Sequence, residues 1–148
     1  MVAVKLEYYW ILCSYQDIYS IHFPSSQVGY VGSQGNAIYK TTDGGTTWVP
    51  IPVINTVKTL YFLDINTGYV GCDDNNVGKT TDGGLTWTWF PLGFWSSYSI
   101  FFLDNNTGYV AGAPGYYIVK TTDGGSSWNY HNTNVNYKQF ANSISRIK

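Results

Sequence analysis

Residues 41–48 read Thr-Thr-Asp-Gly-Gly-Thr-Thr-Trp, and the same phrase returns at 80–87 and 121–128 with changes only at its sixth and seventh positions. The three copies close on Trp48, Trp87 and Trp128. A period of roughly 40 residues is typical of repeat architectures, so it decides the fold before any local feature does. We call each copy of the phrase a box.

Each box is preceded by three short runs rich in Val, Ile, Tyr and Phe and followed by a fourth, with Gly, Asn and Asp clusters between them. Such runs are typical of strands, and such clusters of tight turns. Strands are expected near 19–23, 28–32, 37–42 and 47–52, near 59–63, 68–72, 76–81 and 86–91, and near 99–103, 108–112, 117–122 and 127–132. Four strands per repeat match one blade of a β-propeller. We therefore expect an all-β fold of four-stranded antiparallel blades over about 18–53, 57–92 and 97–135.

The box residues are interpreted as structural. The third-position Asp is suited to accept backbone N–H groups within the turn, and the following Gly pair tolerates positive φ. The closing Trp is large enough to wedge between neighbouring blades. The structural box residues are Thr41, Asp43, Gly45, Trp48, Thr80, Asp82, Gly84, Trp87, Thr121, Asp123, Gly125 and Trp128.

The two ends of the chain each resemble part of a repeat. Residues 7–13 align with the strand that follows a box, and residues 141–147 align with the first strand of a repeat. We interpret 1–148 as a single partial propeller domain with three full blades and two orphan strands. Because closed propellers have four to eight blades, we favour completion by a second copy of the chain, and a piece of a longer propeller is the alternative. Residues 1–13 do not read as a signal peptide.

The boxes match the Asp-box, or BNR repeat, pattern Ser/Thr-x-Asp-x-Gly-x-Thr-Trp, except for Ser127 where Thr is usual. With the Asn-Thr-Gly-Tyr-Val turns at 66–70 and 106–110, residues 18–135 resemble the propellers of Ycf48-like photosystem II assembly factors. They also resemble repeats of sortilin-type receptors, sialidases and xyloglucan-degrading glycosidases. The resemblance implies a propeller, and the families that share it have unrelated functions. A Ycf48-like role implies docking onto a membrane complex through an arginine-rich patch, whereas this chain has one arginine, Arg146.

Composition excludes several function classes. The net charge is −1, so there is no electrostatic case for nucleic acid or an anionic membrane, and no apolar run is long enough to span a bilayer. Charged residues make up 11% and aromatic residues 18% of the chain, which favours an extracellular, cell-surface or periplasmic location.

Cys13 and Cys72 occupy unmatched repeat positions, so two free thiols are favoured over a disulfide. No spacing indicates zinc, and no cofactor is expected.

The candidate binding residues lie in loops that a propeller gathers on one face. Residues 87–96 are the richest in large aromatic side chains, and exposed aromatic residues are typical of recognition sites for protein or sugar. Covering a seam between blades or subunits is the favoured alternative for them. Asp73 and Asp74, beside two Asn residues, suit either a calcium site or, more commonly, a polar hairpin. The candidates are Trp89, Phe90, Phe94, Trp95, Asp73, Asp74 and Tyr116.

The function that these features favour is a non-catalytic protein-interaction or scaffold module, with a carbohydrate-binding, lectin-like propeller as the alternative. A glycoside hydrolase is less favoured, because it needs two facing carboxylates and nothing in the sequence selects such a pair. A sialidase of the Asp-box group uses an arginine triad, and the single Arg146 argues against that role. No catalytic residue is assigned. The expected partners are a second copy of the chain and a protein or carbohydrate ligand.

Overall fold

The computed structural model describes residues 16–93, 95–113 and 117–132. Within these ranges all regular structure is β-strand, which confirms the all-β class. Likewise, none of these residues forms a helix with the length and apolarity needed to cross a membrane. The expected orphan strands at 7–13 and 141–147, and the candidates Phe94 and Tyr116, lie outside the described residues.

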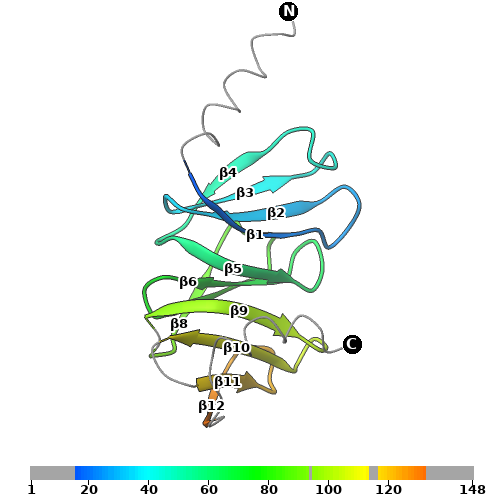
Figure 1. The fold of residues 1–148 in the computed structure, drawn as a ribbon. Helices are drawn as coiled ribbons and strands as arrows, with labels where there is room; N and C mark the ends of the chain where they lie inside the picture. Colours follow the sequence, from blue (N-terminus) through cyan, green and yellow to red (C-terminus); the bar gives the residue numbers. More distant parts are fainter. Residues whose placement is uncertain (1–15, 94, 114–116, 133–148) are drawn as a thin grey trace, which may run out of the picture.

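The strands form three separate four-stranded antiparallel sheets, each in sequence order, as expected for propeller blades (Figure 1). Blade 1 contains β1 (Ile18–His22), β2 (Gly29–Ser33), β3 (Ala37–Thr41) and β4 (Val49–Pro52). Blade 2 contains β5 (Val57–Phe62), β6 (Gly68–Cys72), β7 (Asn76–Thr80) and β8 (Thr88–Pro91). Blade 3 contains β9 (Ser96–Phe102), β10 (Gly108–Ala113), β11 (Tyr117–Thr121) and β12 (Asn129–Asn132).

The outermost strand of each blade begins at the residue after the box Trp, two residues later than the sequence predicts. β4, β8 and β12 start at Val49, Thr88 and Asn129. The reason is that side-chain hydrogen bonds within the box hold its last residues in the turn instead of the sheet.

The first strand of each blade pairs with the second through a β-bulge at the same repeat position. The pairing passes from Ile18 to Ser20 in blade 1 and from Val57 to Thr59 in blade 2. In blade 3 the partners of Gly112 and Ala111 are Ser97 and Ser99. One residue per blade is therefore left out of the ladder: Tyr19, Lys58 and Tyr98.

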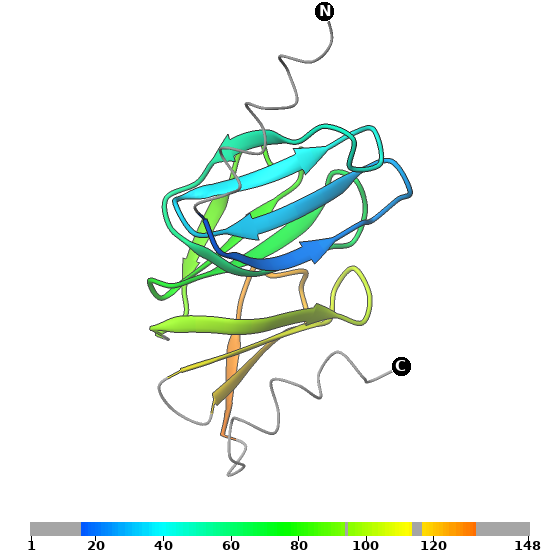
Figure 2. The ribbon, with the colours of Figure 1, turned by 45° about the horizontal axis from the view of Figure 1, so that its top comes forward.

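The blades follow one another with their first strands, β1, β5 and β9, side by side along one edge (Figure 1). Figure 2 shows the sheet of blade 1 lying across that of blade 2. The apolar core lies in the two seams between blades, as expected for stacked sheets. The first seam buries Tyr30, Ile38, Val57, Leu60, Phe62, Val70 and Cys72. The second buries Tyr69, Val77, Leu92, Ile100, Phe102, Val110 and Val119.

Candidate functional site

The box turn of blade 1 is closed by two side chains. The Thr41 hydroxyl donates to Asp43 Oδ1 (2.7 Å) and accepts the Gly45 N–H (2.9 Å). The Asp43 carboxylate accepts the Thr47 N–H (2.8 Å) and the Thr47 hydroxyl (2.6 Å). The hydroxyl of Thr47, its N–H and the Thr41 hydroxyl, in that order, lower the pKa of Asp43 to about 2.

The other two boxes repeat this geometry. The hydroxyls of Thr86 and Ser127 donate to Asp82 and Asp123 at 2.5 and 2.6 Å and lower the pKa of each carboxyl to about 2. Ser127 departs from the repeat pattern but still makes this hydrogen bond to Asp123, because serine has the same hydroxyl donor as threonine. All three carboxylates are therefore ionised at neutral pH and accept hydrogen bonds within their own turns. None of them can act as a general acid at neutral pH.

The turns between the first and second strands of blades 2 and 3 use aspartate in the same way. Burial opposes the shift at Asp64, but the N–H groups of Thr67 and Asn66 outweigh it and lower the pKa of this carboxyl. The N–H groups of Asn106 and Thr107 lower the pKa of Asp104. These two carboxylates are also turn staples.

A tyrosine and a lysine of blade 1 reach two turns of blade 2, one of which is its box. Lys40 Nζ donates to the Gly83 carbonyl (3.0 Å). The Tyr30 hydroxyl donates to the Ile65 carbonyl (2.7 Å), and its ring stacks on Phe62 with centroids 3.5 Å apart. Burial, with a smaller contribution from the charge of a nearby aspartate, raises the pKa of Tyr30 to about 12.

The contact between blades 2 and 3 is built from the equivalent residues. Lys79 Nζ and the Tyr69 hydroxyl both donate to the Gly124 carbonyl, at 2.6 and 2.8 Å. The Tyr69 ring stacks on Phe102 at 3.9 Å. We call this set of contacts the joint. Sequence reasoning assigned no role to the tyrosine and lysine, although both belong to the repeated phrases Gly-Tyr-Val and Lys-Thr-Thr and so carried a signal.

The candidate aromatic residues of 87–96 lie in different places. Trp89 and Phe90 are half-buried on β8, where successive side chains point to opposite faces. Trp89 packs on the seam with blade 1 and Phe90 on the seam with blade 3. Trp95, just before β9, is 76% exposed. Of the three candidates in this segment that the structure describes, Trp95 alone is available to a partner.

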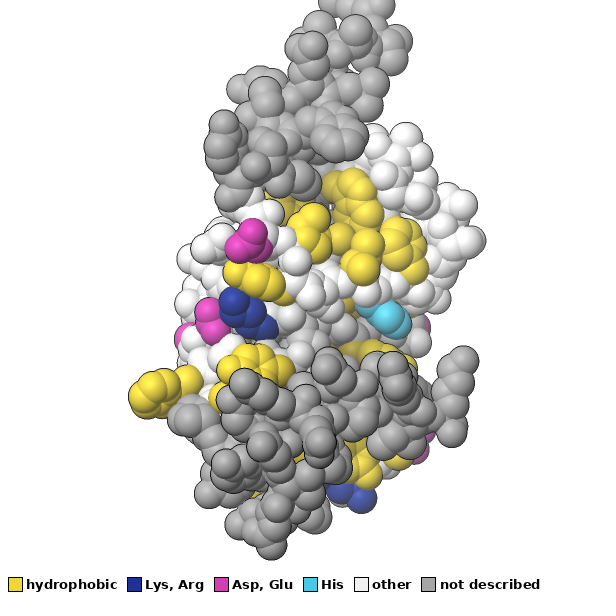
Figure 3. Space-filling model, viewed as in Figure 1, with side chains coloured by type: hydrophobic (Ala, Val, Ile, Leu, Met, Phe, Trp, Pro, Cys, Tyr) yellow, Lys and Arg dark blue, Asp and Glu magenta, His cyan; other side chains and the backbone are white. Residues whose placement is uncertain are grey.

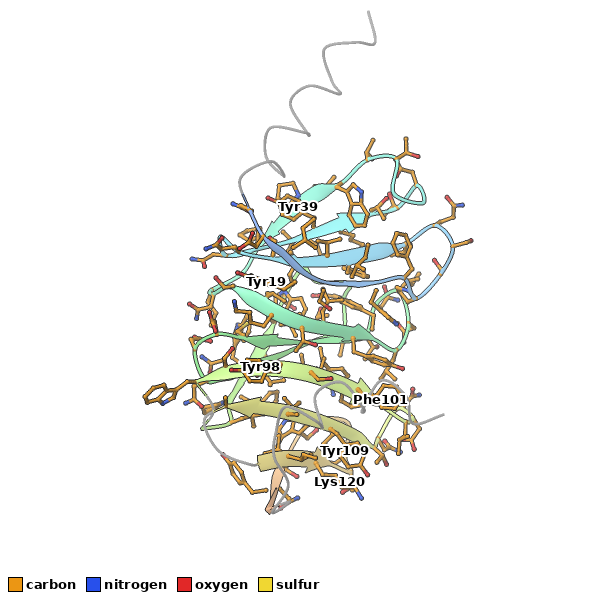
Figure 4. All side chains as sticks on the ribbon, in the orientation of Figure 1. Tyr19, Tyr39, Tyr98, Phe101, Tyr109 and Lys120 are labelled. Atoms are coloured by element: carbon orange, nitrogen blue, oxygen red, sulfur yellow. The ribbon has the colours of Figure 1, made fainter. Side chains whose placement is uncertain are left out.

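The three bulges leave one residue out of the ladder at the same position of each first strand. A bulge turns its extra residue away from the ladder, and such bulges are common next to functional sites. Here the residues are Tyr19, Lys58 and Tyr98, and both tyrosines are exposed. Figure 4 shows Tyr19 and Tyr98 on the same side of the molecule, on the outer two of the three adjacent strands β1, β5 and β9. We call these three residues the bulge row.

Lys58 connects the bulge row to an acidic candidate residue. Its Nζ lies 3.7 Å from the centre of the Tyr19 ring, within cation–π range, and 3.6 Å from Asp73 Oδ2. In Figure 3, basic, acidic and hydrophobic side chains gather over the starts of the first strands. The sequence indicated Asp73 and Trp95 for this region but not the bulge row, because a bulge has no residue signature of its own.

Asp74 makes its hydrogen bonds within and beside the loop between β6 and β7, and it is not a member of the bulge row. Its Oδ2 accepts hydrogen bonds from the side-chain amides of Asn55 and Asn76, the latter at 2.8 Å. Behind it Cys72 is a free, buried thiol, and burial and the neighbouring Asp74 and Asp73 charges raise its pKa to about 12. Within the described ranges, no three His, Cys, Asp or Glu side chains are grouped to hold a metal.

Stacked four-stranded blades define a β-propeller array, and solved structures of this class match the chain. A Ycf48 protein bound to a D1 peptide has a TM-score of 0.66 and 26% identity, covering 76% of this chain and 39% of its own. Ycf48 from Cyanidioschyzon merolae has a TM-score of 0.66 and 21% identity, covering 78% of this chain and 37% of its own. A GH74 enzyme of Niastella koreensis has a TM-score of 0.64 and 23% identity, covering 76% of this chain and 22% of its own.

These likenesses confirm the expected resemblance to Ycf48 propellers and the fold. This chain spans about two-fifths or less of the length of the proteins it resembles. No protein-family model and no curated protein matches the sequence. GH74 enzymes and Ycf48 share these blades, so the fold alone does not indicate whether the chain is a catalyst or a binding protein. The function must be inferred from the side chains.

Proposed function

We propose that this chain is a non-catalytic, protein-binding propeller module that holds an extended protein segment across the bulge row. The observation that carries this proposal is the repeated bulge, which leaves Tyr19, Lys58 and Tyr98 out of the ladder at one repeat position, with both tyrosines exposed. If these positions served only the packing of the strands, we would expect apolar or small residues there, like those on either side of each bulge residue. A bulge at the same position of all three blades is better explained by the surface that it builds.

The chemistry of the row suits a peptide. Tyrosine and tryptophan supply large contact areas with few rotatable bonds, and they are enriched where binding energy is concentrated. Trp95, just before β9, adds another exposed aromatic ring to the segment that carries Tyr98, and Lys58 supplies a cation held between an aromatic ring and Asp73. An extended segment with an apolar or aromatic anchor and an acidic group matches this pattern. A solved neighbour, the Ycf48 structure bound to a D1 peptide, supports a peptide ligand.

Seven of the eight described carboxylates favour binding over glycoside hydrolysis. A hydrolase of this class needs a carboxylic acid whose pKa is raised, facing a second carboxylate across the sugar. The five aspartates of the box and first-to-second-strand turns have lowered pKa values. Asp73 and Asp74 are held by Lys58 and by Asn side chains. Every one of these seven carboxylates thus has a structural partner.

The test is a selection of random peptides displayed on phage against the intact chain. Selected peptides are expected to bind, and Tyr98→Ala or Trp95→Ala is expected to weaken binding at least tenfold, about 1.4 kcal/mol. Leu85→Ala is the matched control, because Leu85 is as exposed as Trp95 but lies in a box turn. Peptides that bind both variants as tightly as the wild type would overturn the proposal.

The lectin alternative is tested with the same variants on a glycan array. Exposed tyrosine and tryptophan rings can also stack on sugars, so this alternative rests on the same side chains. Glycan binding that Tyr98→Ala abolishes, with no peptide selected, would replace the protein-binding proposal by the lectin. Release of reducing sugar from a polysaccharide by the wild type would replace it by the hydrolase.

A further inference from the structure

The joint has two complementary halves, and among the described residues each half lacks its partner at one end of the array. The forward half is a tyrosine of the second strand and a lysine of the third, as in Tyr69 and Lys79. The backward half is the phenylalanine on which the tyrosine stacks and the first glycine carbonyl of the box, as in Phe102 and Gly124. Blades 1 and 2 present a forward half, and blades 2 and 3 receive it.

Blade 3 carries a forward half of its own. Tyr109 and Lys120 pair across β10 and β11 as Tyr69 and Lys79 pair across β6 and β7. The distance from the amine to the ring centre is 5.6 Å, compared with 5.3 and 5.8 Å in the two occupied joints. Figure 4 shows Tyr109 and Lys120 next to each other at the end of the array. Within the described ranges, the Lys120 amine has no carbonyl to which it donates.

Blade 1 carries a backward half to which none of the described residues is joined. Ile21 is 60% exposed, whereas its equivalents Leu60 and Ile100 are 4% and 5% exposed. Phe23 is 39% exposed, whereas its equivalents in the occupied joints are each 2% exposed. Exposed apolar side chains at positions that a repeat otherwise buries mark a surface that is built to be covered.

The glycine of the first box is already in the receiving conformation. Gly44 has a φ of 70°, and Gly83 and Gly124 have φ values of 73° and 66°. Gly44 is exposed, whereas the other two are buried under the lysine and tyrosine of the preceding blade. The glycine of the backward half therefore already has the backbone conformation that its equivalents have in the occupied joints.

We propose that the forward half on blade 3 of one copy binds the backward half on blade 1 of a second copy, with Lys120 donating to the Gly44 carbonyl and Tyr109 stacking on Phe23. The occupant is a second copy because the chain itself presents the matching half. Two copies of three blades make six (2 × 3), which lies within the four to eight blades of closed propellers. In such a ring both joints are equivalent, as two-fold symmetry requires.

The test uses two variants that each block one half. Ile21→Asp places a charge on the exposed apolar surface of blade 1 that also carries Phe23, and Tyr109→Asp removes the stacking ring from the forward half. By light scattering, wild type is expected to have twice the single-chain mass of 16.6 kDa. Each variant alone is expected to have a mass of 16.6 kDa. Leu85→Asp, a charge on another exposed apolar residue outside the joint, is expected to leave the dimer intact.

Mixing the two variants distinguishes the proposed joint from other dimers and from loss of folding. The unblocked forward half of the Ile21→Asp chain can bind the unblocked backward half of the Tyr109→Asp chain. The mixture is therefore expected to restore a species of twice the single-chain mass that contains one copy of each variant. A monomeric wild type, a dimer that Ile21→Asp leaves intact, or a mixture that stays monomeric would each overturn the proposal.

Discussion

The first threonine of each box illustrates how much depends on one hydroxyl. Thr80 is buried, donates to Asp82 Oδ1 (2.8 Å) and accepts the Gly84 N–H (2.9 Å). Thr80→Val keeps the shape but leaves that N–H buried without a partner, which is expected to cost about 2 kcal/mol of unfolding free energy. Denaturant unfolding of the variant and the wild type measures this loss of unfolding free energy. Thr81→Val, at the exposed neighbour, is the control and is expected to change stability little; equal losses would contradict the assigned role of Thr80.

The box aspartates predict how stability depends on pH. Their pKa values fall from an ordinary 3.8 to about 2 in the folded state. Because the folded value is the lower one, their contribution is complete above the unfolded value and is lost as pH falls through the folded value. The melting temperature is therefore expected to drop between about pH 4 and pH 2. Asp82→Asn is expected to make this drop shallower, and an unchanged slope in thermal melts would contradict the assignment.

Sequence reasoning at the residue scale succeeded where the motif is local. The Thr, Asp and Gly of each box form their contacts within a few residues, so the pattern contains nearly all the information needed. Lys40 and Tyr30 instead act on Gly83 and Ile65, in the next repeat. Such contacts depend on how blades stack, and a single repeat does not contain that information.

At the scale of elements, the joint predicts that a hydroxyl between two sheets stabilises both. Tyr69→Phe keeps the ring on Phe102 but removes the hydrogen bond to Gly124. The loss is expected to be about 1 kcal/mol, because Lys79 still donates to the same carbonyl. Tyr98→Phe is the control, since its exposed hydroxyl makes no hydrogen bond with the part of the chain that the structure describes. Unfolding experiments in which both variants lose the same stability would contradict the joint.

The strands themselves were predictable, and their irregularities were not. Runs of β-branched and aromatic residues placed the ends of all twelve described strands within about three residues, the largest difference being the start of β9 at Ser96. The late starts of β4, β8 and β12 follow from box hydrogen bonds that compete with the ladder. The bulges at Tyr19, Lys58 and Tyr98 could not be predicted, because register depends on pairing with the second strand and not on residue type.

At the scale of the whole molecule, one repeated unit accounts for both the stacking of the blades and the surface they present. The joint connects each blade to the next and leaves Tyr109 and Lys120 at one end and Phe23 at the other. The bulge row follows from the same repetition, because equivalent residues of adjacent first strands lie in line. The repeat period indicated the stacking, whereas the row became visible only with the three registers side by side.

The bulge row as a peptide-binding surface is tested most directly by titrating the isotope-labelled wild type with a phage-selected peptide, followed by nuclear magnetic resonance. We expect the Trp95 indole and the amides of Tyr19, Lys58 and Tyr98 to shift together with one affinity, while the amides of the box turns, such as Leu85, do not shift. Shifts confined to the box turns, or a bound peptide that leaves the bulge row unchanged, would contradict the proposed binding surface.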